Sequence, residues 1–131
     1  MAPKALIDHV VMYVKDVKKC RAFYEPILAL LGAEVKWDRE DDGYVCFATP
    51  GVPTRFIIAG GPNTRVGKNH VAFKADSEDV VQRFHELALK LGGEDYGKPG
   101  IRENYAPDYY AAFVLDPEGN NVELVKWPSE D

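Results

Sequence analysis

The pattern of hydrophobic and polar residues predicts the same order of elements twice along the chain. In the first half, residues 6–14 are apolar and β-branched, which favours a strand. Apolar residues then recur near helical spacing up to Leu31, with Asp16 as the predicted N-cap and Gly32 as the predicted helix end. Three short apolar segments follow and predict strands over residues 33–37, 43–48 and 54–59. The first half is therefore predicted to be β-α-β-β-β.

The second half repeats this order. Residues 69–75 predict a strand, and the next helix is predicted to begin at Ser77 and to end at Gly92-Gly93. A weak strand over 94–96 precedes an insertion at 97–108, and two apolar runs flank the turn signal Asp116-Pro117-Glu118-Gly119-Asn120. The insertion breaks the symmetry of the two halves, and such segments tend to carry function.

Matching residues support a duplicated module. His9-Val10 recurs as His70-Val71, 61 positions later, and the residues Phe23, Glu25 and Gly32 recur at the same offset as Phe84, Glu86 and Gly93. Each match falls in the same predicted element of its half, which chance does not readily supply. We therefore expect one domain over residues 1–131, made of modules 1–60 and 69–131 joined by a linker at 61–68.

Composition and charge limit the partners of the protein. Its 131 residues are 46% hydrophobic and 28% charged, which is typical of a globular domain. A net charge of −5 argues against nucleic-acid binding, which needs a basic patch. No apolar run approaches the roughly 20 residues that span a bilayer, and a charge interrupts the N-terminus before a signal-peptide core forms. We expect neither nucleic acid nor membrane as a partner, a cytoplasmic location, and reduced thiols at Cys20 and Cys46.

Glu123 is the one charge within the last apolar run, and a carboxylate in that setting needs a charged, hydrogen-bonding or metal partner. His9 and His70 occupy equivalent strand positions, so packing of the modules about a pseudo-twofold axis would bring them together. Two imidazoles and one carboxylate suit a divalent iron, manganese, nickel, cobalt or zinc ion and leave coordination positions open. The alternatives are hydrogen-bonded core histidines and a purely structural metal site. We predict a metal site at His9, His70 and Glu123, whereas His85 is expected to be exposed and not a ligand.

The module order, with Asp8-His9-Val10, residues 69–73 and the Asp116–Glu123 segment, resembles the vicinal oxygen chelate superfamily. That superfamily includes glyoxalase I, fosfomycin and bleomycin resistance proteins, and extradiol dioxygenases. The resemblance implies an α+β fold of two βαβββ modules, whose paired, curved mixed sheets enclose a metal-binding cleft. It also implies that His9, His70 and Glu123 are the metal ligands. Many glyoxalase I enzymes have a fourth ligand on the last strand of the first module, but residues 55–58 offer none.

Several residues near this predicted site are candidates for contact with a substrate. Those expected to bind substrate are Arg102, Tyr105, Tyr110 and Arg55. Tyr109 and Glu123 are expected to be catalytic, since a tyrosine can act as an acid or base. The alternative for this group is structural: Tyr109 and Tyr110 would point to opposite sides of a strand, and Arg102 would hold its own loop in place.

The predicted function is that of a metal-dependent lyase, isomerase or dioxygenase acting on a small molecule with vicinal oxygens. The alternative is a non-catalytic small-molecule binding or resistance protein of the same fold. The resemblance also leaves a homodimer open, because modules of this kind pair within or between chains.

Overall fold

The computed structural model describes residues 5–127; residues 1–4 and 128–131, which the predicted modules include, lie outside the described residues. Module A comprises β1 (His9–Val14), α1 (Val17–Ala29), β2 (Glu34–Arg39), the short 3-10 turn η1 (Glu40–Asp42), β3 (Tyr44–Ala48) and β4 (Arg55–Gly60). Module B comprises β5 (His70–Lys74), α2 (Glu78–Lys90), β6 (Glu94–Ile101), β7 (Tyr110–Leu115) and β8 (Asn121–Lys126). The predicted α+β fold with two βαβββ modules is confirmed.

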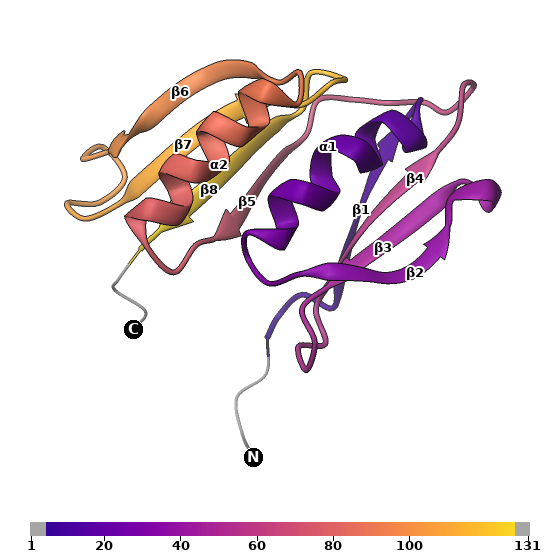
Figure 1. The fold of residues 1–131 in the computed structure, drawn as a ribbon, viewed down its shortest axis with the longest axis horizontal. Helices are drawn as coiled ribbons and strands as arrows, with labels where there is room; N and C mark the ends of the chain where they lie inside the picture. The colour runs from indigo at the N-terminus through magenta and orange to yellow at the C-terminus, as the bar shows by residue number, and fades with distance from the viewer. Residues whose placement is uncertain (1–4, 128–131) are drawn as a thin grey trace.

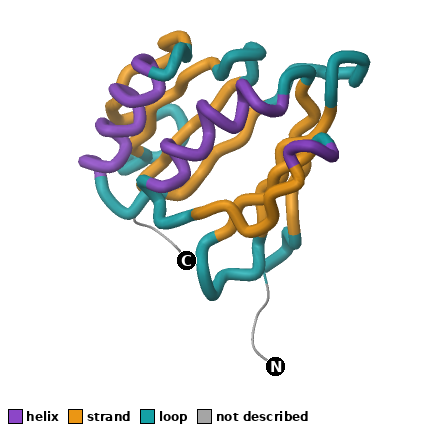
Figure 2. Tube along the Cα trace, turned by 45° about the vertical axis from the view of Figure 1, so that its right-hand side comes forward, coloured by secondary structure: helices purple, strands orange, loops and turns teal. Residues whose placement is uncertain are grey.

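Each module forms its own mixed sheet. The strand order is β1-β4-β3-β2 in module A and β5-β8-β7-β6 in module B, with β1–β4 and β5–β8 parallel and the other neighbours antiparallel. Figure 1 shows the sheets side by side, both helices in front of them, and β1 and β5 running in opposite directions. Figure 2 also shows the helices gathered in one layer over the strands. Each sheet therefore has a helix-covered face and a second face, here called its open face.

One hydrophobic core lies between the helices and the sheets and includes residues of both modules. Its largest fully buried side chains are Tyr24, Phe23, Phe47 and Phe84. The rings of Phe56 on β4 and Phe73 on β5 lie 5.1 Å apart at 86°, an edge-to-face contact that joins the modules. A smaller apolar cluster of Ala111, Phe113 and Val125 lies on the open face of module B.

The predicted helix ends are confirmed. The Asp16 side chain accepts a hydrogen bond from the Lys19 amide at the start of α1, and the Ser77 side chain accepts one from the Val80 amide at the start of α2. Gly32 follows α1 with a φ of 83°, a left-handed conformation that glycine adopts without a Cβ clash. The 3.6-residue hydrophobic periodicity, together with the capping residues and glycines at the helix ends, therefore predicted the positions of both helices.

Two expectations were wrong. The weak strand predicted over 94–96 continues as β6 to Ile101, within the predicted insertion. Since β6 is an edge strand with register shifts against β7, it tolerates the glycines and Pro99 that read as a loop. His85 is buried at 8% exposure, and its Nε2 lies 2.9 Å from the Asp95 carboxylate.

Within residues 5–127, no helix has the length and apolar character needed to cross a membrane.

Candidate functional site

Glu123 is buried on the open face of module B and is only 2% exposed. Its neighbours Val122 and Leu124 point into the main core, so strand alternation turns Glu123 to the opposite face. One carboxylate oxygen lies 2.8 Å from His70 Nε2, and the other accepts a hydrogen bond from the Tyr109 hydroxyl. Within one chain, the partners that this buried carboxylate requires are therefore His70 and Tyr109.

The parallel pairing of β5 with β8 positions His70 over Glu123. Ala72 lies directly opposite Glu123, and His70 lies two residues earlier on the same face of β5. Because Ala72 has only a methyl side chain, it leaves space beside the carboxylate for the imidazole of His70. The local register thus explains how two residues 53 positions apart come into contact.

Tyr109 is held as a hydrogen-bond donor. Burial, the hydrogen bond to Glu123 and the charge of that carboxylate raise the pKa of the Tyr109 hydroxyl, in that order of importance. Its ring lies 5.0 Å from the Tyr105 ring and 5.1 Å from the Trp127 ring. The Tyr109 ring therefore packs between two aromatic neighbours.

The other predicted residues of module B separate into two groups. The Arg102 guanidinium lies 5.4 Å from the ring centre of Phe113, which pairs with Glu123 on the open face. That guanidinium donates to the carbonyls of Lys98 and Gly100, so it holds its own loop in place. Tyr110 accepts a hydrogen bond from the Gln82 side chain of α2. The structure therefore brings Tyr105, Tyr109 and Arg102 to the open face, but not Tyr110.

His9 and Arg55 lie on module A, directly opposite each other in the parallel pair β1–β4. The His9 side chain is 52% exposed and its Nδ1 lies 2.8 Å from the Asp8 carboxylate. As Figure 1 shows, β1 and β5 start at opposite ends of the sheet layer, and His9 and His70 are the first residues of these strands. Among residues 5–127 of one chain, no three histidine, cysteine, aspartate or glutamate side chains are close enough to hold a metal.

The donors present fit part of a metal centre. An imidazole nitrogen and a carboxylate oxygen are the ligand types that divalent transition metals bind. His70 Nε2 and Glu123 Oε1, 2.8 Å apart on a shared face, are close enough to coordinate the same ion. His70 and Glu123 thus form a two-donor half-site, and the described residues of one chain bring no third histidine, cysteine or acidic side chain to it.

A comparison of the two modules identifies the position that corresponds to Glu123. In module B, His70 pairs with Asn121, and Glu123 follows two residues later; in module A, His9 pairs with Arg55, and Ile57 follows two residues later. Ile57 is therefore the structural equivalent of Glu123, and it has no donor atom. At the position equivalent to Glu123, module A therefore has no carboxylate, and the acid beside the imidazole of His9 is Asp8.

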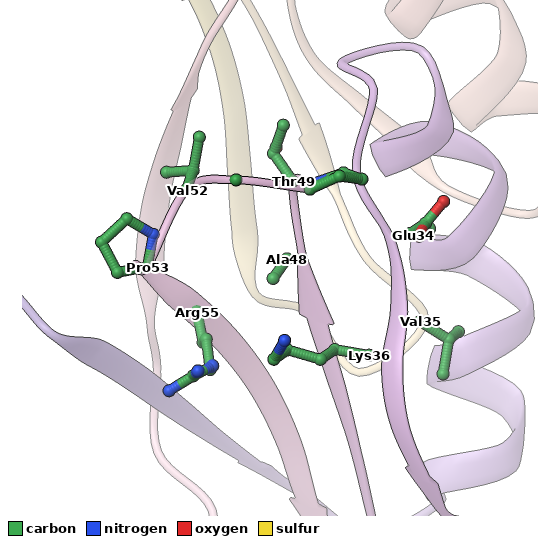
Figure 3. A pocket seen from close by; sticks show the side chains of 10 residues that line it. Glu34, Val35, Lys36, Ala48, Thr49, Val52, Pro53 and Arg55 are labelled. Atoms are coloured by element: carbon green, nitrogen blue, oxygen red, sulfur yellow. The ribbon is translucent and has the colours of Figure 1, made fainter.

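A cavity of about 510 Å³ opens beside Arg55 on module A. Figure 3 shows Arg55 and Lys36 among the side chains that line it. Sequence reasoning did not single out Lys36, because an exposed lysine in a short strand carries no distinguishing signal. Its position beside the cavity becomes apparent only when the sheet places it near Arg55.

Comparison with known proteins gives consistent matches. Residues 6–124 match the family described as Glyoxalase/Bleomycin resistance protein/Dioxygenase superfamily. The uncharacterized protein YqjT of Bacillus subtilis (strain 168) is 30% identical over 130 residues, which cover 91% of this chain and 97% of that protein. A glyoxalase/bleomycin resistance protein from Albidiferax ferrireducens T118 superposes with a TM-score of 0.77 at 24% identity, over 95% of this chain and all of that one. Lactoylglutathione lyase from Agrobacterium tumefaciens has a TM-score of 0.70 at 20% identity, over 98% and 100% of the chains.

Proposed function

From the premise that the chain belongs to the Glyoxalase/Bleomycin resistance protein/Dioxygenase superfamily, we propose that it is a metal-dependent enzyme acting on a small molecule with vicinal oxygens. The observation that carries this proposal is the His70–Glu123 half-site on the open face of module B, where Glu123 is buried and the His70 side chain is 51% exposed. Lyase, isomerase and dioxygenase chemistry all fall within the proposal, since each begins with a substrate whose oxygens bind a cation.

The metal site is proposed to form between two copies of the chain, with His70 and Glu123 from one copy and His9 from the other. Two features support this arrangement. The imidazole of His9 is half-exposed on an open sheet face, and the His70–Glu123 half-site lies on the other open face. The described part of a single chain supplies no third donor to that half-site. A homodimer is therefore part of the proposal.

A divalent ion held there acts as a Lewis acid toward the substrate oxygens. The residues of the chain prepare the site for it. Tyr109 fixes one oxygen of Glu123 and so orients the carboxylate, as partners of metal ligands commonly do. Burial, the hydrogen bond to Glu123 and the charge of Glu123 raise the pKa of the Tyr109 hydroxyl, so it stays protonated and keeps donating to that carboxylate. The rings of Tyr105 and Trp127 pack against the Tyr109 ring and support its position.

Complementation between two inactive variants tests the shared site. His9→Ala and Glu123→Ala homodimers should each lose stoichiometric metal, measured after titration and gel filtration. Unfolding and refolding an equimolar mixture should restore binding, because a mixed dimer contains one site with both substitutions and one site with neither. A His85→Ala variant is the matched control, since this histidine lies between α2 and β6 and should leave the metal content unchanged. If the mixture binds no metal although wild type does, the shared site is wrong; if wild type binds none, the metal-dependent function is wrong.

A non-catalytic binding protein is the second candidate function. It is favoured by the observation that His9 does not join His70 and Glu123 within the described part of one chain. A binding protein would hold its ligand equally well with and without metal, whereas the proposed enzyme requires the ion. Comparison of ligand affinity in chelator-treated and metal-loaded protein separates the two functions.

A further inference from the structure

The cavity on module A is built around a small residue, Ala48, and two cations, Arg55 and Lys36, line it. Ala48 on β3 pairs with Arg55 on β4 on one side and with Glu34 on β2 on the other. Its methyl side chain leaves a hollow of about 510 Å³, bounded by the 49–53 loop. Figure 3 shows Lys36 extending across β3 toward Arg55, while the carboxylate of Glu34, the one acidic group of the lining, points away from both.

Arg55 has an unused donor at this cavity. Its guanidinium lies 4.8 Å from the ring centre of Trp37, a contact that holds the side chain flat against the sheet. Its Nε is buried and has no hydrogen-bond acceptor among the described residues. A buried donor without an acceptor is unfavourable, and a small shift of the Arg55 side chain toward an anionic oxygen in the cavity would satisfy it.

Arg55 and Lys36 both lie close to the buried Cys46 thiol. Cys46 lies two residues before Ala48 on the same strand face and is fully buried. Burial raises the pKa of its thiol, whereas the charges of Arg55 and Lys36 act in the opposite direction. Both cations are therefore close enough to act on the same buried thiol.

The position of the cavity relates it to the proposed metal site. Arg55 lies directly opposite His9 on the open face, and the cavity extends from Arg55 away from β1 toward β2. We infer that this cavity binds an oxyanion group of the substrate, a carboxylate or a phosphate, through Arg55 and Lys36. The assignment of the occupant as part of the substrate rests on the proposed function; the binding of an oxyanion does not. The substrate class is then an anionic molecule whose charged arm extends away from its vicinal oxygens.

Intrinsic fluorescence gives a direct test on metal-free protein. The chain has two tryptophans, and a Trp127→Phe background leaves Trp37, which contacts Arg55, as the sole reporter. Phenylphosphonate and benzoate should each change Trp37 fluorescence saturably, and neutral benzamide should not. The two acids also distinguish a preference for phosphate from one for carboxylate.

Variants localise the effect. Arg55→Gln and Lys36→Gln should each weaken binding of the preferred acid about tenfold or more, as expected for loss of a charge-assisted hydrogen bond. Lys68→Gln removes one positive charge from the linker and is the matched control. Ala48→Leu should block binding by filling the cavity without changing the charge. Circular dichroism and a thermal melt verify that each variant folds.

The outcomes separate this inference from the proposed function. If both acids leave Trp37 unchanged, or if Lys68→Gln weakens binding as much as Arg55→Gln, the oxyanion cavity is wrong even where the protein binds metal. If the acids bind through Arg55 and Lys36 but wild type binds no metal, the cavity stands and the metal-dependent function fails.

Discussion

The hydroxyl of Tyr24 on α1 donates a buried hydrogen bond of 2.6 Å to the carboxylate of Asp116 in the turn between β7 and β8. This bond links module A to the Asp116–Asn120 turn of module B. The same Asp116 also accepts from the amides of Glu118 and Asn120, and it thereby shapes the turn. Glu118 in turn accepts from the amides of Lys15 and Asp16 at the start of α1. The turn therefore fixes how the two modules pack.

Replacement of Tyr24 by phenylalanine should destabilise the whole domain. Tyr24→Phe leaves the ring in the core but removes one donor from the buried Asp116, at a cost of about 1.5–3 kcal/mol for a hydrogen bond to a charged group. Urea denaturation should show a lower midpoint with an unchanged slope. Tyr96→Phe, at a 60% exposed position, is the control and should leave the midpoint near that of wild type. Equal midpoints for Tyr24→Phe and wild type would mean that the bond does not join the modules energetically.

Features that depend on residues close together in the sequence could be predicted from the sequence. Helix caps at Asp16 and Ser77 and the left-handed glycine after α1 follow from periodicity and capping chemistry alone, and the apolar run around Glu123 is consistent with its burial. The packing of one module on the other depends on long-range contacts such as Tyr24–Asp116. For that reason the sequence did not show that no third ligand joins His70 and Glu123 within the described part of one chain.

The errors have a similar origin. His85 carries an ionisable side chain in the second helix and reads as exposed, but its ring lies under the edge strand β6 against Asp95. That strand was itself underestimated, since its glycines and Pro99 are tolerated only because it pairs on one side. Prediction of the burial of His85 required the true length of β6.

The contact between His85 and Asp95 should make stability depend on pH in acid. The hydrogen bond from His85 and a second from the Gly97 amide lower the pKa of Asp95 below its ordinary 3.8. Because the folded state favours the charged carboxylate, this stabilisation is present above about pH 3.8 and is lost as pH falls below it. Asp95→Asn should therefore lose less stability than wild type between pH 6 and pH 3, measured by urea midpoints. Asp41→Asn, at an exposed position in η1, is the control. If the stability of Asp95→Asn depends on pH as that of wild type does, the Asp95 carboxylate is not the source of the pH dependence.

Loss of the Tyr109 hydroxyl should weaken metal binding without removing a ligand. In Tyr109→Phe, Glu123 loses the donor that orients one of its oxygens, and changes of this kind typically reduce metal affinity by about tenfold to a hundredfold. Competition with a chromophoric chelator measures the change. Tyr105→Phe removes a hydroxyl from the neighbouring ring, which is 58% exposed, and should have little effect. If the two variants bind metal with the same affinity as wild type, Tyr109 does not support the proposed site.

Addition of a carboxylate at the position equivalent to Glu123 should complete a four-ligand site. Ile57 bears the same relation to His9 as Glu123 bears to His70, so Ile57→Glu places an oxygen donor beside the proposed third ligand. Without metal, the half-buried carboxylate should destabilise the protein by about 1–3 kcal/mol. Because metal binds the folded state, a divalent ion should raise the melting temperature of Ile57→Glu more than that of wild type. Ile57→Leu is the control for packing at this position. If the ion raises the melting temperature of Ile57→Glu no more than that of Ile57→Leu, residue 57 does not face the metal. The proposed pairing of His9 with His70 and Glu123 across two chains is then wrong.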